Sequence, residues 1–247
     1  MKIGVNQGFV ESMEVFGSDL TVVNAARVSF DKEHTEFQSP QDEKLIHYLA
    51  RNGHNSPFFH PQIRFRIRMP IFVAREWFRH TVGFARNEVS RRYVDDEPEI
   101  WCPTVLRARD TNKKQGSKME AIANNSERVE QVQKYMTESV AFYRGLLEDG
   151  VAPEIARAIL PQGMYTEFIE TGSLAAYARL CGLRLDPHAQ LEIREYAAAV
   201  SKMLEGLFPV SWKALTADLG SVPVPVPAAK GHTPDTSHTL QPSVTPV

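Results

Sequence analysis

A stretch of nineteen residues at 75–93, REWFRHTVGFARNEVSRRY, sets the narrowest limits on how this chain can fold. It holds five arginines, two glutamates and a histidine, interleaved with the rings of Trp77, Phe78, Phe84 and Tyr93. So many ionisable groups near a core are costly unless they are paired or face a ligand. An amphipathic helix and turn with a solvated basic face would accept the charges but would not need the rings. A site for a flat polyanion would use both, because guanidinium forks bind phosphate and aromatic walls hold a ring.

The composition narrows the classes of protein. Of the 247 residues, 43% are hydrophobic and 23% charged, which is ordinary for a globular enzyme with a sizeable core. The formal net charge of -2 argues against a generally basic nucleic-acid binder, so an anion site has to be local. No apolar run suits a signal sequence or a membrane span, which predicts a cytoplasmic protein without a membrane partner. Cys102 and Cys181 have neither metal-ligand nor disulfide spacing, and no metal site is expected.

Periodicity predicts the elements that precede the charged stretch. Ser18 or Asp19 can cap a helix that turns Val22, Val23 and Ala26 inward. A second short helix is expected over 42–51. Residues 62–69 alternate in period two, which predicts a strand with Ile63, Phe65 and Ile67 on an apolar face and Arg64, Arg66 and Arg68 on a basic one. This basic face is either solvated or lines a cleft. Pro70 suits the first turn of a helix that runs to about His80.

The second half of the chain is predicted to be helical. Helices are expected over 125–150, over 153–161 between two prolines, and over 165–181 and 187–207. From residue 220 onward, six of the sixteen prolines and few large apolar side chains indicate disorder. The expected organisation is one catalytic domain at 1–218 and a proline-rich disordered tail at 219–247.

The charged stretch resembles the signature of the flavin-dependent thymidylate synthases, which reads R-H-R, seven residues, S, and continues through N-E-x-S-x-R-Y. The matching positions are Arg79, His80, Asn87, Glu88, Ser90, Arg92 and Tyr93. Thr81 replaces the second arginine, and one extra residue lies between His80 and Asn87. Further segments are similar to this family in the same order: AARVSFD at 25–31, GHNSPFFH at 53–60, PIFVAREWFRH at 70–80, ARAILP at 156–161 and LRLDPHAQ at 183–190. The resemblance covers residues 1 to about 215.

This resemblance implies an α+β fold, in which a small antiparallel sheet packs with helices, and a homotetramer with active sites at the subunit interfaces. It implies FAD as the cofactor, NADPH as the reductant and methylenetetrahydrofolate as the carbon donor. The implied reaction is methylation at C5 of a uridine monophosphate, UMP or dUMP. Reduced flavin supplies the hydride in this family and no cysteine activates the pyrimidine, which agrees with the two unpromising cysteines here.

The resemblance also assigns a nucleotide side. Its positions are Glu76, Arg79, Glu88, Val89, Ser90, Arg91, Arg92, Arg157 and Arg184. Residues 88–92 are expected to bind the 5'-phosphate, and Arg157 from a neighbouring subunit completes the clamp. Arg184 is the predicted catalytic residue, because a fixed positive charge beside the uracil favours its N3-ionised form and polarises C5. The alternative for Arg184 is a structural arginine between two apolar helices. His188 and Gln190 match family positions, but the predicted site does not include them.

The cofactor side is expected at Ser29, His54, Ser56, Arg79, His80, Thr81, Asn87, Glu88, Ser173 and Arg179. Here the chain departs from the family pattern. Family Asn, Arg and Asn positions align with Ser173, Ala175 and Arg179, and a family glutamate is replaced by Phe59. With Thr81, these changes remove two positive charges and at least two polar contacts, and Arg86 and Arg179 are the candidate substitutes.

The extra residue before Asn87 is similar to the variant of this family that methylates UMP in polyoxin antibiotic biosynthesis. The sequence therefore predicts a C5-methylating enzyme that accepts UMP and/or dUMP. Two alternatives share the fold: a dUMP-specific thymidylate synthase, and a hydroxymethylase that stops before the hydride step. A non-catalytic homologue and an RNA-binding module with arginines and stacking rings are further alternatives.

Overall fold

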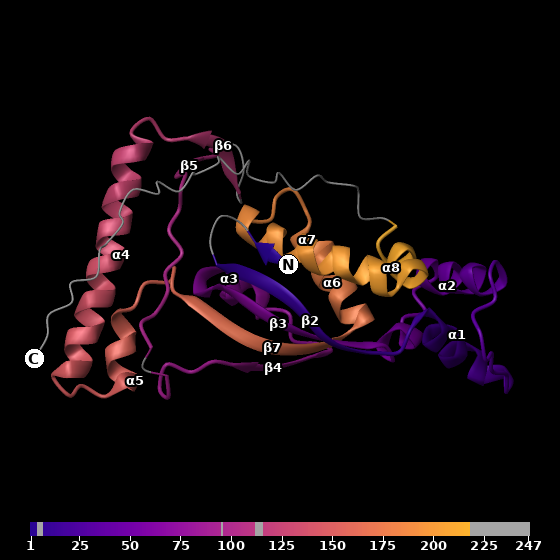
Figure 1. Cartoon of the computed structure of the whole chain (residues 1–247). Helices are drawn as coiled ribbons and strands as arrows, with labels where there is room; N and C mark the ends of the chain where they lie inside the picture. The colour runs from indigo at the N-terminus through magenta and orange to yellow at the C-terminus, as the bar shows by residue number, and fades with distance from the viewer. Residues whose placement is uncertain (4–6, 95, 112–115, 218–247) are drawn as a thin grey trace, which may run out of the picture.

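The computed structural model describes residues 1–3, 7–94, 96–111 and 116–217. Its centre is a five-stranded sheet in the order β1-β2-β3-β7-β4, with every neighbouring pair antiparallel (Figure 1). The strands are β1 (Lys2–Ile3), β2 (Gly8–Phe16), β3 (Gln62–Pro70), β7 (Tyr165–Ser173) and β4 (Phe84–Glu88). A separate pair is formed by β5 (Arg107–Arg109) and β6 (Ser117–Ala121). This mixture of helices and antiparallel strands confirms the α+β expectation.

Helices cover the apolar face of the sheet, and others lie at its two ends. Figure 1 places α4 and α5 at one end and α1 and α2 at the other. The helices are α1 (Asp19–Arg27), α2 (Gln41–Arg51), α3 (Ile71–Trp77), α4 (Asn125–Glu148), α5 (Pro153–Ala156), α6 (Leu174–Arg184), α7 (Leu191–Leu207) and α8 (Pro209–Leu215). Short 3-10 turns are η1 (Val28–Phe30), η2 (Ser56–Phe59) and η3 (Arg157–Ile159). None of these described helices is both long and apolar enough to span a membrane.

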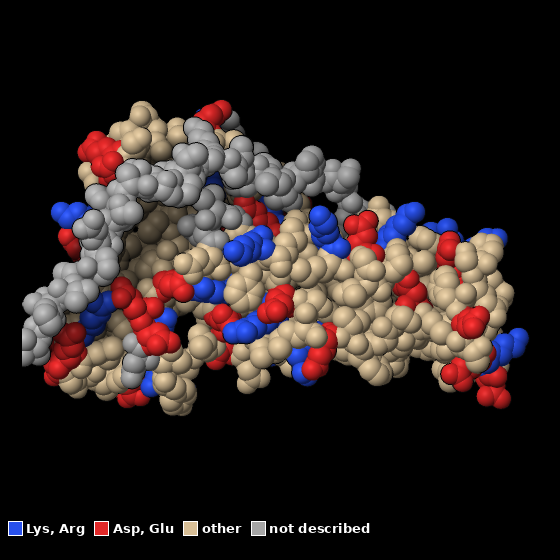
Figure 2. All heavy atoms as spheres, in the orientation of Figure 1, with Lys and Arg blue, Asp and Glu red and all other residues tan. Residues whose placement is uncertain are grey.

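Strand β3 supplies the clearest link from sequence to packing. Its alternation buries Ile63, Phe65 and Ile67 completely, in a core shared with α6 and α7. The three arginines on the opposite face pair with carboxylates on neighbouring segments, Arg64 with Glu14 at 2.8 Å, Arg66 with Glu167, and Arg68 with Glu99 at 2.7 Å. In the space-filling view, positive and negative side chains are interspersed over this region (Figure 2). The basic face is therefore a partly exposed row of ion pairs in this chain.

Helices α1, α2 and α4, strand β3 and the short helical segment after Pro153 confirm their predictions. The helix expected over 165–181 is wrong, because residues 165–173 form β7 and α6 begins only at Leu174. Burial along β7 alternates at Phe168, Glu170 and Gly172, but a glutamate and a glycine at inward positions leave no apolar alternation in the sequence. Helix α3 ends at Trp77, three residues before the predicted end, and α7 begins at 191 where 187 was expected. The predicted tail at 219–247 lies outside the described residues.

Candidate active site

The charged stretch folds as the end of α3, a turn at 78–83 and the edge strand β4. Gly83 makes this turn possible, because its φ of 81° belongs to the left-handed region that favours glycine. A Cβ here would lie 2.9 Å from the Ala176 Cβ and 3.2 Å from the Ser173 Oγ. The turn is therefore packed closely against the start of α6. Strand β4 then carries the rest of the signature along one side of β7.

Most of the predicted phosphate-binding turn lines one cavity of about 630 Å³. Glu88, Val89, Ser90 and Arg91 form one part of its wall, and Arg157 from η3 lines it as well. The single chain thus brings Arg157 to this turn, although the resemblance implied that a neighbouring subunit does so. Two contacts hold the turn: the Thr166 hydroxyl donates to the Glu88 carboxylate at 2.5 Å, and the Val89 N–H donates to the Glu167 carbonyl at 2.9 Å.

The two consecutive arginines of the turn differ in their surroundings. Arg91 lines the cavity, donates from Nη1 to the Asp96 carbonyl, and has a buried Nε without a hydrogen-bond partner among the described residues. Arg92 is exposed, lies 5.1 Å from the centre of the Tyr93 ring, and donates from Nε to the Ser90 hydroxyl at 3.4 Å. Arg91 is accordingly the arginine of the pair that faces the cavity, and a phosphate role for Arg92 stays a prediction.

Arg184, the last residue of α6, lies in a second cavity of about 760 Å³. Glu76 shares this cavity, as do His188 and Gln190, which the sequence-based site did not include. The guanidinium donates from Nε to His80 Nε2 at 3.0 Å and from Nη2 to the Glu76 carbonyl at 3.3 Å. Its Nη1 is 3.5 Å from the Glu76 carboxylate. Arg184 is therefore oriented by the end of α3 and by the histidine of the signature.

His80 is held in its neutral form by this arrangement. Its Nε2 accepts the hydrogen bond from Arg184, so in the neutral ring the proton belongs on Nδ1. Burial lowers the pKa of His80 to about 4, and the charges of Arg184, Arg86 and Arg179 act in the same direction. Neutral His80 thus orients the Arg184 guanidinium without cancelling its charge.

We expect His80 to titrate near pH 4 in the folded protein, well below its ordinary value of 6.5. Between these two pH values the unfolded chain binds more protons, so the free energy of unfolding should fall as the pH drops from 6.5 towards 4. NMR of the imidazole measures the titration, and urea unfolding of wild type and His80→Gln at several pH values isolates its effect on stability. A midpoint near 6.5 would contradict the proposed geometry.

The predicted cofactor positions are distributed over several elements. Ser29, His54 and Ser56 are exposed on η1 and around η2. Arg79 and Thr81 are exposed on the turn after α3, and Asn87 is exposed on β4. Their exposure leaves these side chains accessible to a ligand.

The two cofactor positions on or beside α6 are already engaged within the chain. Arg179 donates to the Val82 carbonyl at 2.7 Å and lies 5.5 Å from the centre of the Phe59 ring. Ser173 is buried, and its hydroxyl caps α6 by accepting the Ala176 N–H at 3.2 Å. Arg179 therefore joins the signature turn to the segment before β3, whereas the Ser173 hydroxyl is committed to the helix cap.

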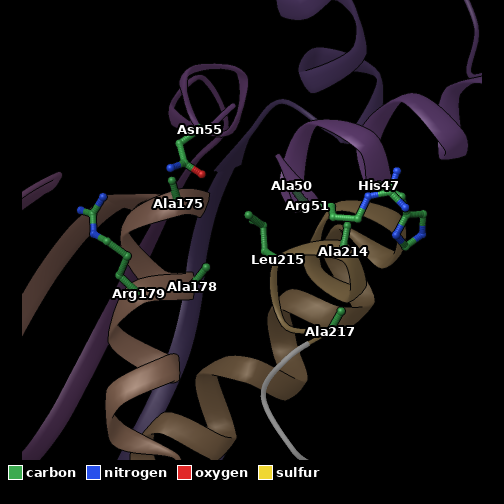
Figure 3. Close-up of a pocket in the computed structure, with 10 residues that line it drawn as sticks. All are labelled: His47, Ala50, Arg51, Asn55, Ala175, Ala178, Arg179, Ala214, Leu215 and Ala217. Atoms are coloured by element: carbon green, nitrogen blue, oxygen red, sulfur yellow. The ribbon is translucent and has the colours of Figure 1, made fainter. Parts of the chain in front are cut away.

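A third cavity, of about 460 Å³, lies beside these positions between α2, α6 and α8. Figure 3 shows Ala178 on α6 turned toward Leu215 and Ala214 across the opening, while the Arg179 side chain extends away from them. Arg51 and Asn55 also line it. Asn55 was missed as a site residue, although it stands in the sequence between two predicted positions.

Arg86 is paired within the chain, which the sequence did not suggest. It was a candidate replacement for a missing cofactor arginine, but its guanidinium forms an ion pair with the buried carboxylate of Glu170. The Arg86 side chain is only 14% exposed. Glu170 occupies the Arg86 Nε, while the buried Nη2 has no hydrogen-bond partner among the described residues, so this arginine is a weaker candidate for a flavin phosphate than Arg179. The misassigned helix at 165–181 concealed Glu170 as its partner.

Comparison with known proteins shows the family of this chain. The model of the family described as thymidylate synthase complementing protein, Thy1, matches residues 11–210. A flavin-dependent thymidylate synthase of Thermotoga neapolitana is 39% identical over 215 residues, covering 87% of this chain and 94% of the relative. One from Thermus thermophilus is 38% identical over 210 residues, covering 85% and 76%.

Solved structures are similar over the same region. The UMP/dUMP methylase PolB from Streptomyces cacaoi, bound with 5-Br dUMP, superposes with a TM-score of 0.75 at 30% identity, covering 88% of this chain and 97% of that one. The same methylase bound with 5-Br UMP gives a TM-score of 0.70. From the family match over most of its length and from these identities, we conclude that the chain belongs to the flavin-dependent thymidylate synthase family.

Proposed function

We propose that this protein methylates C5 of a uridine monophosphate, UMP or dUMP, with methylenetetrahydrofolate as carbon donor, NADPH as reductant and FAD as cofactor. The observation that carries the proposal is the preserved nucleotide side. Residues 88–91 and Arg157 share one cavity, and Arg184 is oriented in a second one by His80. Relatives named as thymidylate synthases and a structural neighbour named as a UMP/dUMP methylase support this reaction.

The cavity beside β4 suits the nucleotide's 5'-phosphate. Arg91 and Arg157 supply planar guanidinium groups, which bind a phosphate dianion through paired hydrogen bonds. Ser90 adds a hydroxyl donor from the same wall. The Glu88 carboxylate lines the same cavity and accepts a hydrogen bond from the Thr166 hydroxyl.

Arg184 suits the uracil end of the nucleotide. Its hydrogen bond from Nε goes to a neutral histidine, and the Glu76 carboxylate is 3.5 Å away, so the positive charge is only partly compensated. Placed against the pyrimidine, this charge would favour the N3-ionised ring and raise the nucleophilicity of C5. Gln190 lines the same cavity and can hydrogen-bond a pyrimidine edge.

The two halves of this site occupy different cavities of one chain. Helix α3 contributes to both, since Glu76 lines the Arg184 cavity and Arg75 lines the Arg157 cavity. We infer that a second copy brings the halves together in a homotetramer with interfacial active sites. Large apolar side chains exposed on α4 and α5 support this assembly: Tyr135 at 70%, Ile155 at 64% and Phe142 at 61%.

The residues on the cofactor side fit a flavin dinucleotide. Arg51 and Arg179 can bind its diphosphate, while the Asn55 amide can bind the polar chain that carries the ring. Ala175 and Ala178 leave room in the same cavity. Bound flavin supplies a hydride when reduced. The residues of this chain bind and orient the reactants, and His80 holds Arg184 with its proton on Nδ1.

The proposal is tested with purified protein. Its absorption spectrum should show flavin, and incubation with methylenetetrahydrofolate, NADPH and either UMP or dUMP should yield a 5-methyl product identified by mass. Acceptance of UMP supports the variant activity, and methylation of dUMP alone indicates ordinary thymidylate synthesis. A 5-hydroxymethyl product, or no product from either nucleotide, would overturn the proposal.

The RNA-binding alternative is less well supported. It relied in part on the three arginines of β3, which are paired with carboxylates. Such pairing removes most of the excess positive charge that attracts a phosphate backbone.

A further inference from the structure

The carboxylate of Glu170 joins three elements at the centre of the signature. It is fully buried on β7, and Trp77 at the end of α3 donates from Nε1 to its two oxygens, each at 3.2 Å. Arg86 on β4 donates to it from Nε. Arg86 and Glu170 are directly opposite each other in the β4–β7 register. One carboxylate thus connects the segment before the 78–83 turn with the segment after it.

The Arg86 guanidinium is held on its other sides by two rings. It lies 5.4 Å from the centre of the Phe78 ring and 4.8 Å from that of Phe84. These are the residues at the beginning of the turn and at the start of β4. Burial raises the pKa of the Glu170 carboxyl, while the Arg86 charge acts in the opposite direction. The ionised pair therefore depends on both partners staying together.

Strand β4 needs such an anchor. It is a five-residue strand at the edge of the sheet and pairs only with β7 among the described strands (Figure 1). Side chains alternate between the faces of a strand, so a slip of one residue would turn Glu88 away from Thr166 and displace Ser90. The same slip would leave the buried Glu170 without its cation, which is strongly unfavourable. The charged pair thus selects one register.

We propose that Arg86 and Glu170 are positioning residues for nucleotide binding, because their pairing sets the β4 register that brings residues 88–91 to the cavity shared with Arg157. The identity of the ligand rests on the proposed function. Neither residue is assigned a contact with the nucleotide. An apolar pair of similar volume would fill the same space but would lack the directional charge pairing that selects the register.

The experiment compares three variants by calorimetric titration with UMP and dUMP and by thermal unfolding. Arg86→Met should lower the melting temperature and weaken nucleotide binding at least about tenfold, because it leaves Glu170 unpaired. Arg86→Met with Glu170→Leu should regain the melting temperature, since a buried ion pair can be replaced by apolar residues, while binding stays about tenfold weak. Arg66→Met is the matched control, because it breaks a partly exposed arginine–glutamate pair between β3 and β7 and should leave both quantities near wild type.

A double variant that regains both stability and nucleotide affinity would show that the pair only fills the core, and would overturn the inference. So would normal affinity in Arg86→Met. Wild-type protein that binds neither nucleotide would overturn the proposed function and this inference with it. If wild type and the double variant bound the nucleotide equally well, only this inference would be overturned and the proposed function would stand.

Discussion

Arg184→Ala should lower kcat for methyl transfer about a thousandfold, the scale of losing a preorganised charge at a reacting centre. The physical reason is that the partly compensated Arg184 guanidinium is the cation we place beside the uracil. In the alanine variant the uracil ring lacks the positive charge that favours ionisation at N3. The flavin content should change little, because no described residue lines both the Arg184 cavity and the cavity of Arg51 and Arg179. Steady-state kinetics, together with a flavin spectrum and a melting curve for each variant, measure these effects.

Two further variants separate charge from geometry at this position. Arg184→Lys keeps a positive charge but loses the planar fork that reaches both His80 and Glu76, so its turnover should lie between those of wild type and the alanine variant. Arg128→Ala is the control, since Arg128 is exposed on α4 and contacts Gln131. If Arg184→Ala turned over at the wild-type rate, the guanidinium would be structural, which is the alternative that the sequence left open.

Arg157→Ala should raise the KM for the nucleotide by about tenfold to a hundredfold, the range expected for losing hydrogen bonds between a charged donor and a phosphate. We expect kcat at saturating nucleotide to change little, because a 5'-phosphate clamp holds the substrate in the ground state and the transition state alike. The side chain is exposed, so its removal should not affect folding. Kinetics at varied UMP and dUMP concentrations make this measurement.

Comparing the binding of the monophosphates with that of uridine tests whether Arg157 contacts the phosphate. Uridine lacks the phosphate, so its weak binding should be the same in wild type and in Arg157→Ala, and the two proteins should differ only towards the monophosphates. Arg128→Ala again controls for the loss of one surface charge. An unchanged KM for both nucleotides would remove Arg157 from the clamp.

Local patterns in the sequence were sufficient to predict many of the helices and strands. The period of two in β3 and the helical spacing in α2 and α4 were read directly, because their apolar positions repeat on one face. The same reading failed at β7, because its inward positions include Glu170 and Gly172 and therefore show no apolar alternation. Ser173, whose hydroxyl caps α6, was the boundary signal that the sequence offered. The chemistry of the nucleotide side could also be predicted from the sequence, since residues 88–91 are adjacent in the chain.

Contacts between side chains far apart in the sequence could not be predicted in this way. Arg86 and Glu170 are 84 residues apart, and His80 and Arg184 are 104 residues apart, so no local spacing shows that each pair is in contact. The amino-acid order specifies which groups are present and which face of an element each one occupies. Packing of β4 on β7 and of α6 on α3 assigns the partners, and through them it makes Arg86 an anchor and Arg184 an oriented cation. The physical reason is that burial and charge pairing depend on distances in space, which chain separation does not encode.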